Sequence, residues 1–448
     1  MRFEEPKREW PRILVVGPTF SQEYGLGTYL GHLFSGCPPG QVAVATDHAH
    51  AIDWSRCGRV YRLGRSEFTY PWLAAWANRY PESGPVSGNQ TVPVKRQALW
   101  PTKVARLLLQ EIVARVWSTE EVLVRPVLSA RIREWINAFA PELIYAHCTS
   151  LVSGWMAQHM ARELGLPLVL HAMDDWGDNL YRAGLWNRRT QRRWRTLDQD
   201  LTRSAAVAIA ICEEMSRAYQ QRYGRKWEWL PMPVDWSAWK RQARCDWSSG
   251  QTFHIRYGGR IGWSIRNSIV AVARAVDQLR AEGEEVEFEI RTFQPEALAL
   301  ELRGLRGVTL EKPGLHQELA AAQASADVLL VCYDFGEEAV KMAQYSMASK
   351  TTECMASGTP CLVYGPAGLP VVEYARREGW GLVVDDPSAQ ALREAILKLR
   401  REIRLRQSLG CRGKHLVETR HDAQFVSEEF RKLLTTAASM RGRRGGAA

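Results

Sequence analysis

The chain has 448 residues, of which 46% are hydrophobic and 24% are charged, so it can bury the cores of two large domains or three smaller ones. No stretch approaches about 18 uninterrupted apolar residues, which argues against a membrane-spanning helix. Lysine and arginine outnumber aspartate and glutamate by 59 to 49, and this basic balance permits an anionic partner without choosing between nucleic acid, membrane and a phosphorylated small molecule.

The first half of the chain predicts strands that alternate with helices. Residues 13–17 form an apolar run typical of a buried strand, and a polar loop with Gly25 and Gly27 leads from it into a helix at 28–34. The alternation continues with strands at 42–46, 143–146, 167–171 and 206–211 and with helices at 151–164 and 213–223. This order predicts a mainly parallel sheet that is covered by helices on both faces.

A segment at about 48–140 interrupts this alternation. It has little strand signal and much arginine, lysine and tryptophan, so we expect a basic helical insertion. Within 104–117 the apolar residues follow a helical stripe, namely Val104, Leu107, Leu108, Ile112 and Val116. Such a stripe favours packing against the core, and a membrane-facing surface is the alternative.

The alternation restarts after a connector with two prolines, Pro231 and Pro233, which is typical of a hinge between compact units. A strand at 253–257, a turn and a helix from Ser268 open this half, and further strands are predicted at 286–290, 328–333, 361–364 and 381–384. After the last strand, Asp386 and Pro387 are expected to cap a helix.

These elements predict an α/β protein with two Rossmann-like domains, at 1–232 and 233–421. We expect the final segment, 422–448, to form a helix at about 422–438 that returns to the first domain, followed by a basic tail at 441–448.

Residues 346–364 carry the most informative chemistry, because Lys350 and Glu353 stand at the start of a short predicted helix that a Gly-Thr-Pro turn and an apolar strand follow. A helix start offers unpaired N–H groups and the positive end of a dipole, so an anion can bind there while Lys350 adds charge. The carboxylate of Glu353 can accept hydrogen bonds from hydroxyl groups. These properties together suit a sugar nucleotide.

The order of such features along the chain resembles that of retaining glycosyltransferases of the GT-B fold, especially family four (group 1). The resemblance extends from residue 13 to about 400 and is carried by Gly25 and Gly27, the segments 141–147 and 166–171, the connector 231–235, Gly259 and Arg260, Lys350 and Glu353, the turn 357–360 and the segment 381–385.

The resemblance implies two Rossmann-like domains that face each other across a cleft, with the acceptor bound mainly by the first domain and the nucleotide-sugar donor by the second. It also implies transfer of a sugar to a hydroxyl group of a glycan, a lipid-linked precursor or a small molecule. Retention of configuration, independence from metals and the absence of any cofactor besides the nucleotide sugar itself, as co-substrate, are implied in the same way.

The resemblance matches His147 to the family's sugar-facing histidine and Arg260 to its phosphate-binding arginine, and we expect Lys350 to be the third catalytic residue. Glu353 matches the residue that holds the donor ribose. The sequence departs from the family pattern at two positions: Ile265 stands where a lysine is usual, and Tyr345 stands where the first of two donor-loop glutamates is usual.

Further candidates follow from position. Gly25 and Gly27 could let the backbone approach the donor diphosphate, and Arg266 is a candidate second phosphate-binding cation, with Lys350 as the alternative. Three residues at the end of the strand at 167–171 or directly after it are candidates for acceptor binding or general-base catalysis, namely His171, Asp174 and Asp175. One of the two aspartates could instead cap the next helix. Asp198 and Asp200 have the spacing of a metal motif, but they fall within a predicted helix and imply no metal.

Two other classes of function stay open. A non-hydrolysing sugar-nucleotide epimerase uses the same two-domain architecture, and a non-catalytic subunit that binds a partner would be consistent with Tyr345 and with the basic insertion.

The remaining expectations concern partners and location. We attribute the basic charge to the anionic donor and to an anionic membrane surface, and not to nucleic acid, because no nucleic-acid-binding motif accompanies it. The nine cysteines are scattered and predict reduced thiols, so we expect a cytoplasmic protein, with peripheral attachment to the inner face of the membrane as an open alternative.

Overall fold

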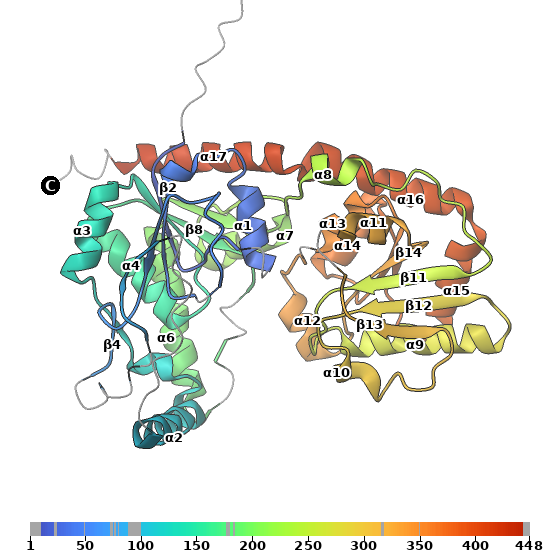
Figure 1. Cartoon of the computed structure of the whole chain (residues 1–448), viewed down its shortest axis with the longest axis horizontal. Coiled ribbons are helices and arrows are strands. Elements are labelled where there is room, and N and C mark those ends of the chain that lie inside the picture. The colour runs from blue at the N-terminus through green and yellow to red at the C-terminus, as the bar shows by residue number, and fades with distance from the viewer. Residues whose placement is uncertain are drawn as a thin grey trace, which may run out of the picture. The chain divides into compact units, whose positions relative to one another are not determined.

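The computed structural model describes residues 10–21, 25–48, 50–71, 75, 78, 80–87, 100–175, 180–181, 184–314, 318–348 and 350–441, with the side chains of 100–106, 109, 110 and 297 left aside. The chain divides into two compact units, which are Met1–Leu230 together with Ser427–Ala448, and Pro231–Val426. Figure 1 shows the elements of both units and labels many of them.

The first unit is built on an eight-stranded sheet of order β10-β9-β8-β7-β1-β2-β3-β5, in which all neighbours are parallel except the edge pair β3 and β5. The strands are β1 (Ile13–Val16), β2 (Val42–Thr46), β3 (Arg59–Arg62), β5 (Gly84–Val86), β7 (Leu143–Ala146), β8 (Leu168–Ala172), β9 (Val207–Ala210) and β10 (Glu228–Trp229). Every residue of β1, β2, β7 and β9 is buried, as expected for parallel strands that are covered on both faces.

The helices of the first unit are α1 (Gly25–Leu33), α2 (Trp100–Trp117), α3 (Ala130–Phe139), α4 (Leu151–Leu164), α6 (Asn187–Ser204), α7 (Glu213–Tyr223) and, from Ser427 onward, α17 (Ala423–Ser439). The chain's last helix joins this unit through aromatic packing. The ring of Phe430, which is fully buried, lies 5.0 Å from that of Phe34 and 5.5 Å from that of Tyr145, measured between ring centroids.

The segment 48–140 contributes more strand than its sequence predicts. Strand β3 pairs in parallel with β2, β5 closes the edge of the large sheet, and β4 (Phe68–Thr69) pairs with β6 (Arg125–Pro126) in a small separate sheet. The segment that was predicted to be a basic helical insertion therefore contains strands as well as the helices α2 and α3. These strands have two to four residues each, which is too short for a clear alternation of apolar and polar residues.

The apolar stripe on α2 does not pack into the core as predicted. Leu107, Leu108 and Ile112 are 59%, 59% and 58% exposed, whereas Val113 is buried. The side chain of Val104 lies outside the described residues. The periodicity identified a helix correctly, but it could not tell which face of that helix the rest of the unit covers.

The second unit contains a six-stranded parallel sheet of order β13-β12-β11-β14-β15-β16. Its strands are β11 (Phe253–Gly258), β12 (Val286–Arg291), β13 (Val308–Glu311), β14 (Val328–Cys332), β15 (Cys361–Tyr364) and β16 (Gly381–Val384). In chain order this arrangement is 3-2-1-4-5-6, the order of Rossmann sheets. The predicted fold class, α/β with Rossmann-like units, is confirmed.

Helices cover both faces of this second sheet, because alternate residues of its central strands belong to different buried clusters. Leu330 and Leu362 lie in a cluster with α9, whereas Leu329 and Val363 lie in a cluster with α13 and α14. The helices are α8 (Trp236–Lys240), α9 (Arg266–Ala281), α10 (Glu296–Ala299), α11 (Leu319–Ala324), α12 (Glu337–Ala343), α13 (Lys350–Ala356), α14 (Pro370–Glu378), α15 (Ala389–Arg401) and α16 (Ile403–Leu416).

One predicted cap is wrong. The hydroxyl of Ser388, and not Asp386 or Pro387, caps α15 by accepting a hydrogen bond from the backbone N–H of Ala391 at 3.3 Å. Asp386 contacts the capping residue itself: its carboxylate accepts a hydrogen bond from the backbone N–H of Ser388 at 2.8 Å.

Two further findings concern the whole described chain. All nine cysteines are free thiols. Within the described ranges, no helix has both the length and the apolar character that crossing a membrane requires.

Candidate functional site

Tyr257 connects two of the predicted cationic residues at the carboxyl edge of the second unit's sheet. It is a buried residue near the end of β11, and its hydroxyl accepts a hydrogen bond from Nζ of Lys350 at 2.9 Å while donating one to the carbonyl oxygen of Arg260 at 2.9 Å. The same ammonium lies 4.1 Å from the centroid of the Tyr257 ring. Lys350 and the turn that carries Arg260 are therefore brought together, as sequence position alone could not show.

Gly259 allows this close arrangement. Its φ of +138° is one that residues with a side chain rarely adopt, and a Cβ atom there would lie 3.5 Å from the Tyr257 hydroxyl and 3.7 Å from Cδ of Lys350. The positive φ is therefore what requires a glycine, since both distances are ordinary van der Waals contacts, and the Gly259 N–H donates to the carbonyl oxygen of Arg291 at 3.0 Å.

The protonation states of Lys350 and Glu353, which lie near Tyr257 and Arg260 in one cluster, follow from their burial and their contacts. Burial alone would lower the pKa of Lys350, but its contacts with Tyr257 outweigh that effect and hold the pKa above its ordinary value. Burial raises the pKa of Glu353, which lies one turn further along α13, to about 7, although the neighbouring Lys350 partly opposes the rise. Among the described residues, the carboxyl group of Glu353 has no hydrogen-bond partner, so its capacity to accept is left for another molecule.

Arg260 and Arg266 differ in their availability. Arg260 is exposed and makes no ion pair with any described residue, which leaves its guanidinium free to bind an anion. Arg266, at the start of α9, instead forms an ion pair with Glu301 at 2.8 Å, and both side chains are about 40% exposed.

The start of α9 is already occupied by a carboxylate of the protein. Asp334 is 2% exposed, and its two oxygens accept hydrogen bonds from the backbone N–H groups of Asn267 and Ser268 at 3.1 and 2.7 Å. An anionic ligand would have to displace Asp334 to use these donors. The prediction that Arg266 binds phosphate at this helix start therefore gains no support, and Lys350 is the better candidate for the second cation.

The turn at 357–360 supports the fold rather than a ligand. The hydroxyl of Ser357 donates to the carbonyl of Cys354 at 2.7 Å, that of Thr359 donates to the carbonyl of Gln323 at 2.9 Å, and Trp247 donates to the carbonyl of Gly358 at 2.9 Å. All the polar groups named here are used inside the protein.

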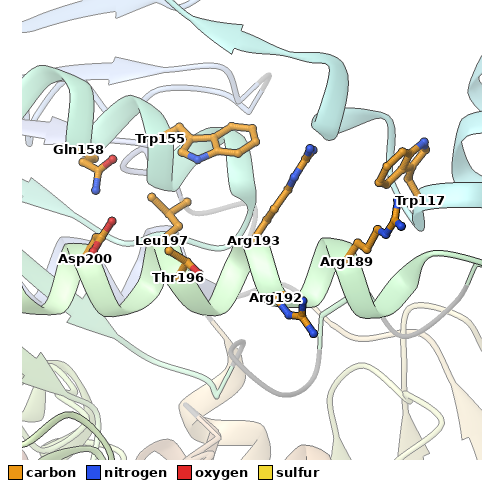
Figure 2. A pocket seen from close by; sticks show the side chains of 9 residues that line it. All are labelled: Trp117, Trp155, Gln158, Arg189, Arg192, Arg193, Thr196, Leu197 and Asp200. Atoms are coloured by element: carbon orange, nitrogen blue, oxygen red, sulfur yellow. The ribbon is translucent and has the colours of Figure 1, made fainter.

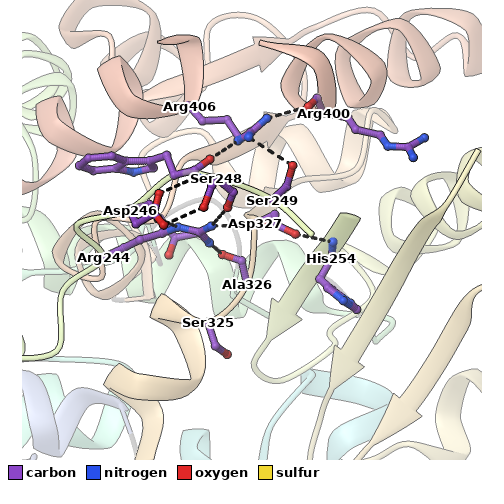
Figure 3. Close-up of polar contacts among 12 residues, drawn as sticks. Arg244, Asp246, Ser248, Ser249, His254, Ser325, Ala326, Asp327, Arg400 and Arg406 are labelled. Carbon is purple, nitrogen blue, oxygen red and sulfur yellow. Dashed lines mark hydrogen bonds and ion pairs between the residues drawn. The ribbon is translucent and has the colours of Figure 1, made fainter. Parts of the chain in front are cut away.

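The segment that carries Trp247 is held by a second buried network, at the amino edge of the same sheet (Figure 3). Asp327 pairs with Arg244 at 3.0 Å and accepts from the backbone N–H of His254 at 2.9 Å, while Arg406 donates to the carbonyl of Trp247 at 2.9 Å. Because ligands bind at the carboxyl edge of open parallel sheets, this network is structural.

His147 follows β7 at the carboxyl edge of the first unit's sheet, and it is 4% exposed. Its Nδ1–H donates to the carbonyl oxygen of His171 at 2.9 Å, which leaves Nε2 as an acceptor. Burial lowers the pKa of His147 to about 4, with a partial compensation from this hydrogen bond, so the ring is neutral at physiological pH. His147 can accept a hydrogen bond from a sugar hydroxyl, but it cannot serve as a cation.

Gly17 and His48 complete this edge, and the sequence did not single them out. Gly17 ends β1 with a φ of +100°, and a Cβ there would lie 3.3 Å from the carbonyl oxygen of His147. His48 follows β2, the other neighbour of β1, and is close enough to His147 to lower its pKa. The spacing of histidines after successive strands was the signal that could have identified His48.

Two predicted acceptor-binding residues are buried and have partners inside the first unit. His171 is 1% exposed, and its ring nitrogens contact the hydroxyls of Tyr145 at 2.9 Å and Tyr29 at 3.4 Å. Asp175 is also buried, and it forms a two-pronged ion pair with Arg222 at 2.8 and 3.0 Å. The polar atoms of both side chains have partners inside the protein, which gives no support to a role in acceptor binding, and the two assignments stay predictions.

The other first-unit candidates remain predictions. Asp174 lies next to Asp175 and is only partly buried. Gly25 and Gly27 do not lie in a loop before the helix, as expected, but in the first turn of α1. Asp198 and Asp200 lie on helix α6, where the carboxylate of Asp198 accepts a hydrogen bond from the hydroxyl of Tyr223.

Tyr345 and the two upstream glutamates also have defined surroundings. The hydroxyl of Tyr345 accepts a hydrogen bond from the side-chain amide of Gln344 at 2.9 Å. Glu337 and Glu338 lie at the exposed start of α12, where Glu337 pairs with Lys341 at 2.7 Å.

Comparison with known proteins gives a family match and a fold. Residues 94–237 match the family model described as Glycosyltransferase Family 4. No curated protein sequence matches the chain at a significant level.

Several solved structures have the same fold at low sequence identity. Sucrose-phosphate synthase from Thermosynechococcus elongatus is 14% identical, with 96% of this chain and 99% of that chain covered and a TM-score of 0.62. HepE from Anabaena, in complex with UDP and glucose, is 13% identical over 95% of this chain and 99% of its own, with a TM-score of 0.58. An α,α-trehalose-phosphate synthase from Burkholderia xenovorans, in complex with glucose-6-phosphate, is 12% identical over 95% and 100%, with a TM-score of 0.58. These structures confirm the GT-B fold that the sequence predicted, and the match over residues 94–237 agrees with the predicted resemblance to family four.

Proposed function

We propose that this chain, which has the fold of GT-B glycosyltransferases and matches glycosyltransferase family 4 over residues 94–237, transfers a sugar from a nucleotide sugar to an acceptor hydroxyl. The observation that carries the proposal is the contact of Lys350 with Tyr257 and, through it, with the turn of Arg260. Glu353, without a hydrogen-bond partner among the described residues, stands beside this cluster.

The cluster suits the chemistry of the leaving group. As the bond between the anomeric carbon and the donor phosphate stretches, negative charge grows on the diphosphate, and cations fixed near it lower the barrier. Lys350 is fixed by Tyr257 and stays protonated, and the Arg260 guanidinium is free to contact phosphate oxygens. The Glu353 carboxylate would accept hydrogen bonds from the ribose hydroxyls.

We propose that the reaction retains configuration and needs no metal, both on the strength of the family resemblance. The acceptor oxygen would then form its bond to the anomeric carbon on the face that the diphosphate leaves. Its proton would pass to an oxygen of the departing phosphate. Neutral His147 would hold a hydroxyl of the sugar through Nε2 and would carry no charge itself.

The test is incubation of the full chain with UDP-, GDP- and dTDP-sugars, with and without a metal chelator, followed by analysis of the products. The solved structure of HepE with UDP and glucose makes UDP-hexoses the first donors to try. Nucleotide release that a chelator does not prevent supports the proposal. Isomerisation of the sugar nucleotide would identify an epimerase, and binding without turnover would identify a non-catalytic subunit.

Two lysine variants make the test specific to the cluster. Replacing Lys350 by methionine keeps an unbranched side chain but removes the charge, and we expect nucleotide release to fall about 100-fold or more. Replacing Lys398 by methionine removes an exposed lysine from α15 of the same unit and should leave the rate unchanged. Equal rates in both variants would refute the role given to Lys350.

A further inference from the structure

One face of the first unit presents apolar side chains to solvent. Three of them lie on the exposed side of α2, where Leu107, Leu108 and Ile112 are each nearly 60% exposed. Two more, Leu185 and Trp186, precede α6 and are 82% and 45% exposed. Exposed aliphatic and aromatic side chains that gather on neighbouring elements usually mark a surface that binds something.

These two groups belong to one surface, because the end of α2 is bound to the start of α6. The backbone N–H of Leu185 donates to the carbonyl of Arg115 at 2.9 Å, and the hydroxyl of Thr190 donates to the carbonyl of Trp117 at 2.6 Å. The two helices lie next to one another in Figure 1.

Helix α6 adds a concentration of positive charge at the same place. Arg188, Arg189, Arg192 and Arg193 are all exposed, and none of them makes an ion pair with a described residue. The opposite side of the helix is buried through Trp194. Unpaired arginines repel one another, so their concentration on one helix favours a partner that brings negative charge.

A groove of about 580 Å³ runs between α4 and α6 beside this charge, and it is lined by Trp117, Trp155, Arg189, Arg192 and Arg193, among others (Figure 2). The guanidinium of Arg193 lies 5.5 Å from the Trp117 ring and that of Arg189 lies 5.1 Å from the Trp186 ring. Cations held beside tryptophan rings are a combination that suits the zone where charged headgroups meet acyl chains.

We propose that this basic–apolar surface, consisting of Leu107, Leu108, Ile112, Leu185, Trp186, Arg188, Arg189, Arg192 and Arg193, binds an anionic phospholipid bilayer. The arginines would contact lipid phosphates, while the aliphatic side chains and Trp186 enter the layer between headgroups and acyl chains. A nucleic acid would satisfy the arginines but would give the aliphatic side chains of α2 no apolar contact. The inference does not rest on the proposed transferase activity.

Flotation of the full chain with vesicles tests the proposal. We expect the protein to float with vesicles of phosphatidylcholine mixed with phosphatidylglycerol, and to float far less with phosphatidylcholine alone. A variant with Arg189, Arg192 and Arg193 all replaced by glutamine should bind the anionic vesicles about 100-fold more weakly, as expected when three basic residues are lost near an anionic surface. A variant with Leu107 and Ile112 replaced by glutamine should also lose binding, with its circular dichroism unchanged.

Matched control variants replace exposed arginines or an exposed leucine of the second unit. Arg274, Arg303 and Arg404 are exposed and make no ion pair with a described residue, and Leu300 is 83% exposed. Replacing the three arginines, or Leu300, by glutamine should leave vesicle binding unchanged. Equal losses in the controls and in the test variants would show general attraction by net charge and would overturn the proposal.

Two other outcomes would also overturn it. In the first, the wild-type chain floats with vesicles of neither composition, which would mean that another partner covers this surface. If glycerol phosphate raises the melting temperature of the wild type but not of the triple arginine variant, while vesicles fail to bind, the groove is a site for a small anion. Binding of a nucleotide sugar, measured without vesicles, should be the same in all variants, so the outcome is separable from that of the proposed function.

Discussion

Replacing Glu353 by glutamine should stabilise the unliganded protein at alkaline pH and weaken its binding of nucleotide sugars. The glutamine has nearly the same shape as the glutamate but cannot ionise. The pKa of Glu353 rises from an ordinary 4.5 to about 7, chiefly because burial disfavours the charged form. A rise of that size means that the folded protein disfavours the ionised carboxylate by about 3 kcal/mol.

The sign of the pH dependence follows from linkage. Because the folded state holds this proton more tightly than the unfolded state does, the contribution of Glu353 to stability is fully present below pH 4.5. It falls as the pH rises and is lost above about pH 7. Between pH 5 and pH 8.5 the wild type should therefore lose about 2.5 kcal/mol that the Glu353→Gln variant keeps.

Urea unfolding of the two proteins at pH 5 and at pH 8.5 measures this difference. A matched control is Glu296→Gln, which removes an exposed carboxylate from the same unit but keeps Glu353, so its stability should fall between pH 5 and pH 8.5 as that of the wild type does. Titration calorimetry at pH 8.5 should show that Glu353→Gln binds the nucleotide sugar about 10- to 150-fold more weakly, since a hydrogen bond to a charged acceptor contributes about 1.5–3 kcal/mol. If the variant is less stable than wild type at pH 8.5, or binds the donor equally well, the assignment of Glu353 as an open acceptor is wrong.

Three further predictions concern Tyr257 in the second unit and Asp175 and His147 in the first. Tyr257→Phe removes the hydroxyl that Lys350 donates to, and nucleotide release should fall at least about tenfold in steady-state assays while circular dichroism stays unchanged. Asp175→Asn leaves a partly buried arginine without its ion pair, and we expect urea unfolding to show a loss of about 2–4 kcal/mol with no change in the affinity for nucleotide sugar. Burial keeps His147 neutral with a pKa of about 4, so its ring nitrogens should show no titration by NMR between about pH 5.5 and 8.

The sequence predicted the strands well because the local pattern determines them. Residues 143–146 and 361–364 are continuous apolar runs, and each forms a strand with those limits, buried at every position. The alternation of strands and helices was sufficient to predict two parallel sheets. The short strand β3 was missed because four residues with two charged ends carry little pattern.

The sequence could not predict contacts between residues that lie far apart along the chain. Nothing in the local sequence shows that Tyr257 accepts a hydrogen bond from Lys350, since the two are separated by 93 positions. The same reason applies to His171, whose position at a strand end was read correctly but whose tyrosine partners lie 26 and 142 positions away. Strand-end position selects candidates, and only the partners of each side chain decide whether it is free for a ligand.

The hydrogen-bond and ion-pair partners of the buried and partly buried carboxylates distinguish those that stabilise the fold from one that is open to a ligand. Glu67 accepts from two hydroxyls and a backbone N–H, Asp175 and Asp327 are paired with arginines, and Asp334 accepts from two backbone N–H groups. Each of these four is fully used inside the protein. Glu353 differs from these four. Burial raises its pKa, and among the described residues no hydrogen bond compensates for that burial. A carboxyl group held in an unfavourable environment without a partner is what a binding site for hydroxyl groups requires, since a ligand that supplies those hydrogen bonds gains the energy that the empty site lacks.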